Sequence, residues 1–196
     1  KTILVLYASQ TGNSEAAAKD LAENKLGQHG FAGKHMQLDD FLELHKAEWT
    51  PVVAIILSSY GVGQSPLGGY QFRSFCDKIM ERDQGDDNKF LGGLQFALLG
   101  LGDSKYTTFF QNPTTTDEAL RKAGAKRVGP LGKADASDPL EQERTIQKWI
   151  GSIGPVLAQA VKQSTVTEDD LRRFQSQTLS MCRDDDETDD SKSNQQ

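Results

Sequence analysis

The chain has 196 residues, enough for one domain with a sizeable core, and 36% of them are hydrophobic. The two cysteines, Cys76 and Cys182, form no Cys-x-x-Cys pair, which argues against a zinc site or a disulfide framework and favours a reducing compartment. The formal net charge is −6 and no basic patch is visible, so nucleic-acid binding is disfavoured.

The negative charge is concentrated towards the C-terminus. Residues 164–196 carry nine acidic and four basic side chains, which leaves residues 1–163 nearly neutral at −1. A frayed helix could form around the apolar residues Leu171, Phe174 and Leu179. Residues 184–196 are acidic and of low complexity, as is typical of disordered segments. We therefore predict one folded domain over residues 1–163 and a polar acidic linker or disordered tail over residues 164–196.

The location of the protein is predicted from what the chain lacks. No stretch approaches the ~20 apolar residues of a membrane span, and no signal peptide is evident. The chain starts at Lys1 without a Met, and we interpret it as part of a longer protein. We expect a monomeric fragment in the cytoplasm, or at the cytoplasmic face of a membrane if an N-terminal anchor precedes it.

In the first half of the chain, strands and helices are expected to alternate. Residues 3–8 are an apolar run typical of a strand, and residues 14–26 have the apolar spacing of a helix. Residues 31–38 predict a weaker strand, and Asp39 and Asp40 would cap a short helix over residues 41–46. Residues 52–57 are apolar throughout, as expected for a parallel strand buried on both faces.

The second half of the chain continues this alternation. A helix follows with one apolar face, expected to be core throughout, made of Phe72, Phe75, Cys76, Ile79 and Met80. A polar loop is predicted at residues 83–89, a strand at 94–100, a helix at 117–123, a short strand at 126–128 and a loop at 131–135. The last helix starts at Pro139, and Gly154 and Pro155 would kink or interrupt it.

Alternating strands and helices predict the α/β class, with a parallel sheet and right-handed crossovers. In such sheets, ligands bind beyond the carboxyl ends of the strands, where the order of the strands reverses. The loops after the first, third and fourth predicted strands contain glycine together with serine, threonine or tyrosine. This coincidence predicts a ligand site at that edge of the sheet.

The loop after the first strand reads Ser9-Gln10-Thr11-Gly12-Asn13-Ser14. Hydroxyls, backbone N–H groups and a helix N-terminus at one point are suited to a phosphate dianion. The loop contains no lysine and does not match the nucleoside-triphosphate pattern G-x-x-x-x-G-K-[ST]. The alternative interpretation is an ordinary capped start of a helix, because serine and threonine are common N-caps.

Tyr60 and Tyr106 each lie in a loop with neighbouring glycines, where there is little core for a tyrosine to fill. Two such rings favour a flat ligand stacked against them, although each ring alone could pack on its own loop. The pairs Gly61-x-Gly63 and Gly100-x-Gly102 lack the third glycine of a dinucleotide fingerprint, so NAD binding is not expected.

Three motifs together resemble the flavodoxin-like FMN domain of diflavin reductases, the family that includes NADPH–cytochrome P450 reductase and methionine synthase reductase. They are Ser9-Gln10-Thr11-Gly12, then Ser59-Tyr60-Gly61-x-Gly63, then Leu99-Gly100-Leu101-Gly102-Asp103-Ser104-Lys105-Tyr106. The resemblance covers about residues 1–163. It implies a flavodoxin-like fold, which is a three-layer doubly wound sandwich around a five-stranded parallel sheet of order 2-1-3-4-5.

The resemblance also implies roles for individual residues toward FMN. The phosphate would be held by Ser9, Gln10, Thr11, Gly12 and Asn13. One face of the isoalloxazine would be covered by Ser58, Ser59, Tyr60, Gly61 and Gly63. The other face would be framed by Leu101, Gly102, Asp103, Tyr106 and Phe109, with Asp135 nearby. Val62 and Gln64 stand where acids are common in the family, which bears on the redox partner rather than on FMN.

The function implied is electron transfer, with no catalytic acid, base or metal. Electrons would pass from NADPH to FAD on a C-terminal module, then to FMN on this domain, and then singly to a haem or cobalamin protein. Two alternatives have the same fold: a free-standing flavodoxin, and a flavodoxin segment of a radical tRNA-modifying enzyme. A third is an interaction domain that has lost its flavin, which Tyr60, Tyr106 and the hydroxyl-rich loop argue against.

Overall fold

A parallel sheet forms the centre of the fold in the computed structural model, which describes residues 1–44, 48–83 and 88–183. Its strands are β1 (Thr2–Ala8), β2 (Ala32–Gln37), β3 (Val52–Ser58), β4 (Gln95–Gly102), β5 (Lys126–Arg127) and β6 (Gly132–Asp135). Both β5 and β6 pair with β4, at opposite ends of that strand, so they share the fifth position of the sheet. The order β2-β1-β3-β4-β5 confirms the predicted fold.

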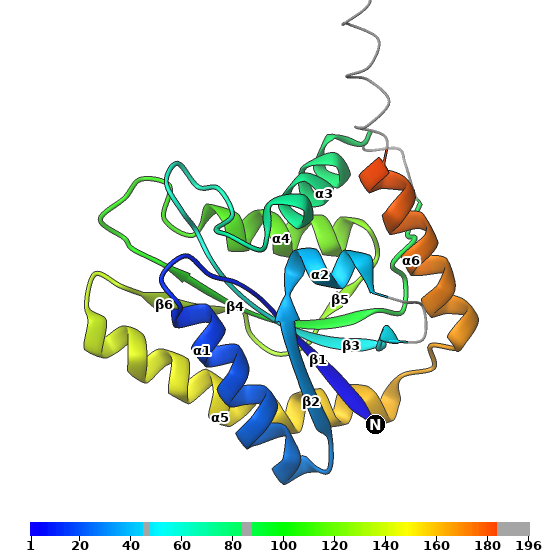
Figure 1. Ribbon diagram of the computed structural model, residues 1–196, viewed down its shortest axis with the longest axis horizontal. Coiled ribbons are helices and arrows are strands. Elements are labelled where there is room, and N and C mark those ends of the chain that lie inside the picture. Colours follow the sequence, from blue (N-terminus) through cyan, green and yellow to red (C-terminus); the bar gives the residue numbers. More distant parts are fainter. Residues whose placement is uncertain (45–47, 84–87, 184–196) are drawn as a thin grey trace, which may run out of the picture.

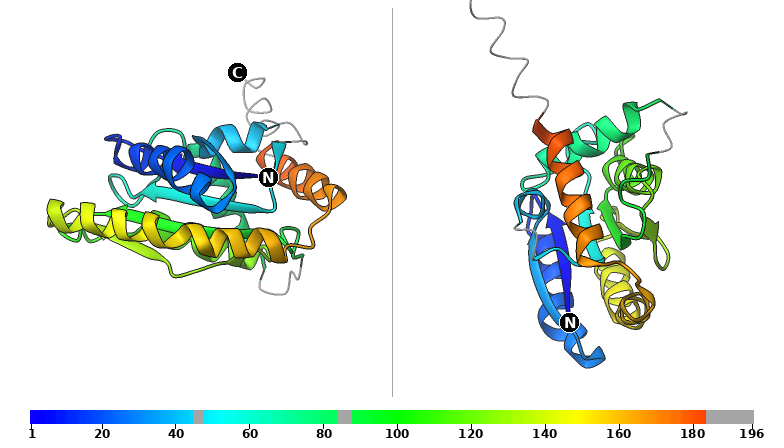
Figure 2. Two further views of the ribbon diagram at one scale, coloured as in Figure 1. Left: turned by 90° about the horizontal axis from the view of Figure 1, so that it is seen from below. Right: turned by 90° about the vertical axis from the view of Figure 1, so that its right-hand side faces the viewer.

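Helices cover both faces of this sheet (Figures 1 and 2). One face carries α1 (Asn13–Asp20) and α5 (Pro139–Gln163), and the other carries α2 (Leu38–Glu43), α3 (Tyr70–Glu81) and α4 (Gln111–Lys122). After α1, the chain continues through a π-helical turn, η1 (Leu21–Lys25), and a 3₁₀ turn, η2 (Leu26–His29). The architecture is therefore three layers, with the sheet in the middle.

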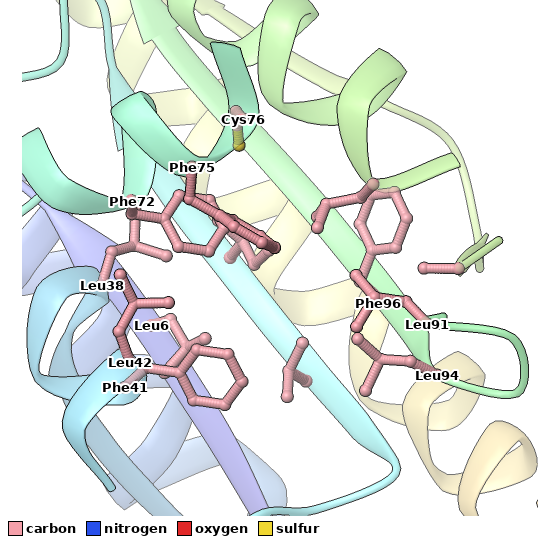
Figure 3. Packing of buried hydrophobic residues seen from close by; sticks show 14 of the residues in the cluster. Leu6, Leu38, Phe41, Leu42, Phe72, Phe75, Cys76, Leu91, Leu94 and Phe96 are labelled. Carbon is pink, nitrogen blue, oxygen red and sulfur yellow. The ribbon is translucent and has the colours of Figure 1, made fainter. Parts of the chain in front are cut away.

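The apolar strands divide their side chains between two cores, because successive residues of a strand point to opposite faces. In β1, Ile3 and Val5 pack under α1 and α5, whereas Leu4 and Leu6 pack under α2 and α3. Figure 3 shows the second of these cores, in which Leu6 meets phenylalanines from α2 and α3. Burial on both faces explains why these strands read as continuous apolar runs.

Four elements differ from the sequence-based expectation. Helix α2 begins at Leu38, so Asp39 and Asp40, predicted to cap a helix over residues 41–46, lie in its first turn. Residues 132–135, predicted as a loop, form β6, because the chain resumes pairing with β4 after Gly129 and Pro130. Helix α4 begins at Gln111 rather than at residue 117. Helix α5 continues without a break through Pro155, which the sequence predicts as a point of interruption.

The predicted boundary after residue 163 is wrong for residues 164–183. They contain α6 (Glu168–Arg183), which packs beside α2 and α3 (Figure 1). Phe174 is fully buried in the same core as Phe75 and Phe96, and the ammonium of Lys78 donates to the carbonyl of Met181. This segment is therefore part of the domain, and residues 184–196, predicted as a disordered tail, lie outside the described residues.

The remaining predictions about buried residues are largely confirmed. Phe72, Phe75, Cys76 and Ile79 of α3 are buried, but Met80, also predicted as core, is 38% exposed at the edge of that face. Residues 84–87 of the predicted polar loop and residues 45–46 of the second predicted helix lie outside the described part of the chain. Among the described residues, no helix meets the length and hydropathy of a membrane span.

Candidate functional site

One cavity of about 410 Å³ opens at the carboxyl edge of the sheet, where ligands of open α/β sheets bind. The loops after β1, β3, β4 and β6 form its walls. The lining residues are Ser9, Gln10, Thr11, Asn13, Ser14, Ser58, Ser59, Tyr60, Gly61, Leu101, Gly102, Asp103, Tyr106, Thr108, Phe109, Ala136 and Gln142. Asp103 is the only acidic or basic side chain among them.

The loop after β1 forms the polar end of the cavity. Gly12 has a φ of 94°, a left-handed conformation suited to glycine, and its N–H donates to the Ser9 hydroxyl at 3.0 Å. Helix α1 starts at the next residue, so its unpaired N–H groups face this loop. The Ser14 side chain is 1% exposed, and its hydroxyl oxygen has no hydrogen-bond partner. An orphaned hydroxyl beside a helix N-terminus, with no cation in the lining, fits an anion held by neutral donors.

The loop after β3 forms a second wall. It closes as a tight hairpin in which Tyr60 and Gln64 exchange two backbone hydrogen bonds of 2.9 Å each. Gly61 and Gly63 make the turn possible, with φ angles of 55° and 87°. The ring of Tyr60 remains 48% exposed, so it is available to cover a ligand.

The loop after β4 forms the opposite wall as a series of turns. The carboxylate of Asp103 accepts the N–H of Lys105 at 2.9 Å, and its carbonyl accepts the N–H of Tyr106 at 3.1 Å. The ring of Phe109 lies against Gly102, where a Cβ atom would come within 2.9 Å of it. Tyr106 is 66% exposed at the rim of the cavity. The cavity thus has two exposed phenol rings, one on each of these loops.

Asp135 lies next to a lining residue, Ala136, and supports a wall of the cavity. It does not line the cavity, and its carboxylate accepts the backbone N–H groups of Ser104 at 3.0 Å and Ser137 at 2.9 Å. These hydrogen bonds hold the pKa of Asp135 well below its usual range, because they favour the ionised form. Asp135 therefore stabilises the loop after β4 by accepting a hydrogen bond from its backbone at Ser104.

The structure brings thirteen of the sixteen predicted site residues to this cavity. The exceptions are Gly12, Gly63 and Asp135, which shape or support the loops without lining the cavity. Four further residues line the cavity: Ser14, Thr108, Ala136 and Gln142. Ser14 ends the loop predicted to hold a phosphate, whereas no role was predicted from the sequence for the other three. Thr108 belongs to a hydroxyl-rich loop and is detectable there, but Gln142 lies in the first turn of α5 and has no motif around it.

Within residues 1–44, 48–83 and 88–183, no group of three or more histidine, cysteine, aspartate or glutamate side chains could hold a metal ion. The lining of the cavity offers a ligand hydroxyls, side-chain amides, backbone N–H groups, one carboxylate and aromatic rings.

Comparison with known proteins agrees with this geometry. The chain is 32% identical over 170 residues to methionine synthase reductase from Rattus norvegicus, a match that covers 86% of this chain. It is 35% identical over 131 residues to the sulfite reductase [NADPH] flavoprotein alpha-component from Thiocapsa roseopersicina, a match that covers 66% of this chain. The chain spans only 23% of the length of each of these two relatives.

Among solved structures, a point mutant of flavodoxin from Pseudomonas aeruginosa superposes on this chain with a TM-score of 0.62. The two sequences are 23% identical, and the superposition covers 80% of this chain and 99% of that flavodoxin. The family model described as Flavodoxin matches residues 5–149, which include most of β1 and all four loops that form the cavity. The chain therefore belongs to the flavodoxin family.

Proposed function

We propose that this chain binds FMN in the cavity at the sheet edge and is the FMN domain of a diflavin reductase. Membership of the flavodoxin family implies FMN binding. The observation that carries the assignment to this cavity is its lining, which combines neutral hydroxyl and N–H donors on the loop after β1 with exposed tyrosine rings on the loops after β3 and β4.

The polar end fits the phosphate of FMN. The Ser14 hydroxyl is buried without a partner, and buried polar groups in folded proteins are rarely left unsatisfied. The hydroxyl of Ser14 lies in the same loop as the hydroxyls of Ser9 and Thr11 and the N-terminus of α1, so a phosphate would find several donors there. Residues 9–14 contain no carboxylate that would repel it. We assign phosphate binding to this loop. Gln10, Gly12 and Asn13 belong to it and would contribute further N–H donors.

The aromatic end fits the isoalloxazine ring. A cavity of about 410 Å³ lies in the range of small-molecule sites, and Tyr60 and Tyr106 would lose exposed apolar surface by stacking on a planar ligand. Leu101 and Phe109 add apolar contact on the side of the loop after β4. These aromatic and apolar side chains would cover part of the surface of a flat ring bound there.

Bound FMN supplies one-electron redox chemistry to the site. The chain's own contribution is binding, orientation and electrostatics. The carboxylate of Asp103 is the only charge in the lining, so the cavity disfavours additional negative charge on a ring bound there. Tyr60 and Tyr106 are both exposed, so a flavin ring held against them would be accessible to a second redox protein.

We further propose that the electron donor is an FAD- and NADPH-binding module C-terminal to this domain. The support is the size of the relatives, since the chain matches less than a quarter of methionine synthase reductase and of the sulfite reductase flavoprotein. The acceptor is then a haem or cobalamin protein. A free-standing flavodoxin is the second candidate, because the flavodoxin of Pseudomonas aeruginosa is matched over 99% of its length.

One experiment separates these two candidates. The FMN-loaded chain is mixed in a stopped-flow instrument with the separately produced FAD/NADPH module of a methionine synthase reductase, and NADPH is added. We expect flavin reduction on the chain that depends on the module. Reduction by a free-standing NADPH–flavodoxin reductase and none by the diflavin module would contradict the proposal.

A further inference from the structure

Asn112 links the two loops that face each other across the cavity, although it does not line the cavity itself. It lies in the first turn of α4 and is 1% exposed. Its side-chain amide donates to the carbonyl of Ser58 at 2.9 Å, and its backbone N–H donates to the hydroxyl of Ser59 at 3.0 Å. The start of the loop over residues 58–63 is thus attached to the segment that follows the loop after β4.

Arg73 holds the other end of the same loop. This side chain of α3 is 17% exposed, and its Nη1 donates to the carbonyl of Gly63 at 2.8 Å and to the amide oxygen of Asn112 at 3.0 Å. Its Nε pairs with Asp77 at 2.9 Å, one helical turn further along α3. A single guanidinium therefore contacts both the end of the loop and the residue that holds its start.

The two residues depend on one another. A guanidinium has only donors, so Arg73 requires the amide oxygen of Asn112 on its side. That orientation turns the amide nitrogen of Asn112 toward the carbonyl of Ser58. A reversed amide would place donor against donor at Arg73 and acceptor against acceptor at Ser58, so the pair fixes one arrangement of the loop.

From this network we infer that Asn112 and Arg73 are positioning residues that preset the loop over residues 58–63 for its flat ligand. The inference rests on the proposed binding of FMN. Because both ends of the loop are held by residues outside the cavity, the loop is ordered before the ligand arrives, and less ordering is needed on binding. FMN affinity and reduction potential then depend on two residues that do not contact the cofactor.

The test uses variants that separate the individual contacts. Asn112→Asp keeps the oxygen that Arg73 needs but replaces the donor to Ser58 with an acceptor. Arg73→Met removes the contacts to Gly63 and Asn112, and Arg73→Lys keeps the charge without the planar fork. Asp77→Asn is the matched control, since it keeps an oxygen for the Nε of Arg73, leaves the contacts to Gly63 and Asn112 in place, and removes only the charge of a side chain that is 46% exposed. Ile79→Val is a second control, which destabilises the core under α3 away from the loop.

FMN dissociation constants are measured by quenching of flavin fluorescence, and one-electron reduction potentials by equilibrium titration with reference dyes. We expect Asn112→Asp and Arg73→Met to weaken FMN binding by about tenfold or more and to shift the potential, because each leaves a buried polar group unsatisfied. Arg73→Lys should recover part of the loss. Asp77→Asn and Ile79→Val should stay within about twofold of the parent, corresponding to small changes in free energy.

Two results would overturn the inference. One is binding of FMN by Asn112→Asp and Arg73→Met within about twofold of the parent, a difference too small for a lost buried hydrogen bond. The other is an equal loss in Ile79→Val, which would assign the effect to overall stability. If the parent chain itself does not bind FMN, the proposed function fails, and the inference fails with it. If the parent binds FMN and the loop variants match it, the inference alone fails.

Discussion

The hydroxyl oxygen of Ser59, on the loop after β3, accepts the backbone N–H of Asn112 in the first turn of α4 at 3.0 Å. The residue at the N-cap position of α4 is Phe110, which has no side-chain acceptor and a φ of 68°. The cap of this helix is therefore supplied by a residue 53 positions earlier in the chain. Ser59 was predicted as a cofactor contact, and in the structure it lines the cavity while its hydroxyl caps a helix.

This cap predicts that Ser59 contributes to stability without any cofactor. Ser59→Ala should lower the free energy of unfolding by about 1 kcal/mol, as loss of an N-cap does in other helices. The control is Ser74→Ala on the exposed face of α3, which should change it by less than about 0.5 kcal/mol. Urea unfolding of the FMN-free protein measures both, and equal effects of the two variants would contradict the capping role.

Gly100 in β4 lies where the chain packs closely against α4. A Cβ atom there would come within 2.5 Å of the Phe110 ring and 2.6 Å of Pro113. Gly100→Ala should therefore destabilise the protein by about 1–3 kcal/mol through overpacking.

The matched control for that substitution is Gly151→Ala in α5, where a Cβ atom would meet nothing within 4 Å. This change should stabilise the protein by up to about 1 kcal/mol, because alanine has the higher helix propensity. Thermal unfolding of both variants gives opposite signs if the packing is as described. A Gly100→Ala variant at least as stable as the parent would contradict the steric constraint at Gly100.

Helix α6 is expected to be an integral part of the domain. Phe174 is fully buried against α2 and α3, so Phe174→Ala should cost about 3–5 kcal/mol of stability. Arg172→Ala, on the exposed face of the same helix, loses only surface ion pairs and should cost less than about 1 kcal/mol. Urea unfolding compares the two variants. A Phe174→Ala variant as stable as the parent would support the boundary at residue 163 that the sequence suggested.

The hydrogen bonds to Asp135 predict a pH dependence. Because its pKa is lowered in the folded state, the carboxylate stabilises the fold above the unfolded-state pKa of about 3.9, and this stabilisation is lost as pH falls through the folded-state pKa. Asp135→Asn should therefore be less stable than the parent at neutral pH, and the difference should shrink in acid. Glu118→Gln, an exposed carboxylate on α4, controls for the loss of one charge.

Carboxyl ¹³C shifts give the direct measurement for Asp135. A titration midpoint below about 3.9 is expected, since that is the value for an unperturbed aspartate. A midpoint at or above it would contradict the hydrogen bonds to Ser104 and Ser137.

The parts of the fold that the sequence predicted are those with a strong local signal. The continuous apolar runs of β1, β3 and β4 identify strands buried on both faces, and the glycine- and hydroxyl-rich loops after them mark the site. In contrast, β6 buries only Gly132 and Ala134 in a run of four residues, too little to distinguish a strand from a loop.

The supporting residues of the site could not be predicted because their partners are distant in the sequence. Asn112 meets Arg73 and Ser58 across 39 and 54 residues, and no spacing within α4 indicates this. Similarly, α6 places Phe174 in the core, but acidic and polar neighbours along the chain resemble those of a solvated tail. In both cases tertiary packing decides the role of the residue.

The central claim, that this cavity binds FMN, is tested most directly by titrating the flavin-free protein with FMN and, in parallel, with riboflavin, which lacks the phosphate. We expect one FMN bound per chain with quenched flavin fluorescence, and much weaker binding of riboflavin. Ser14→Ala should reduce the advantage of FMN over riboflavin, because it removes the buried, unpartnered hydroxyl that we propose as a donor to the phosphate. No binding of FMN, or equal binding of the two flavins, would contradict the account.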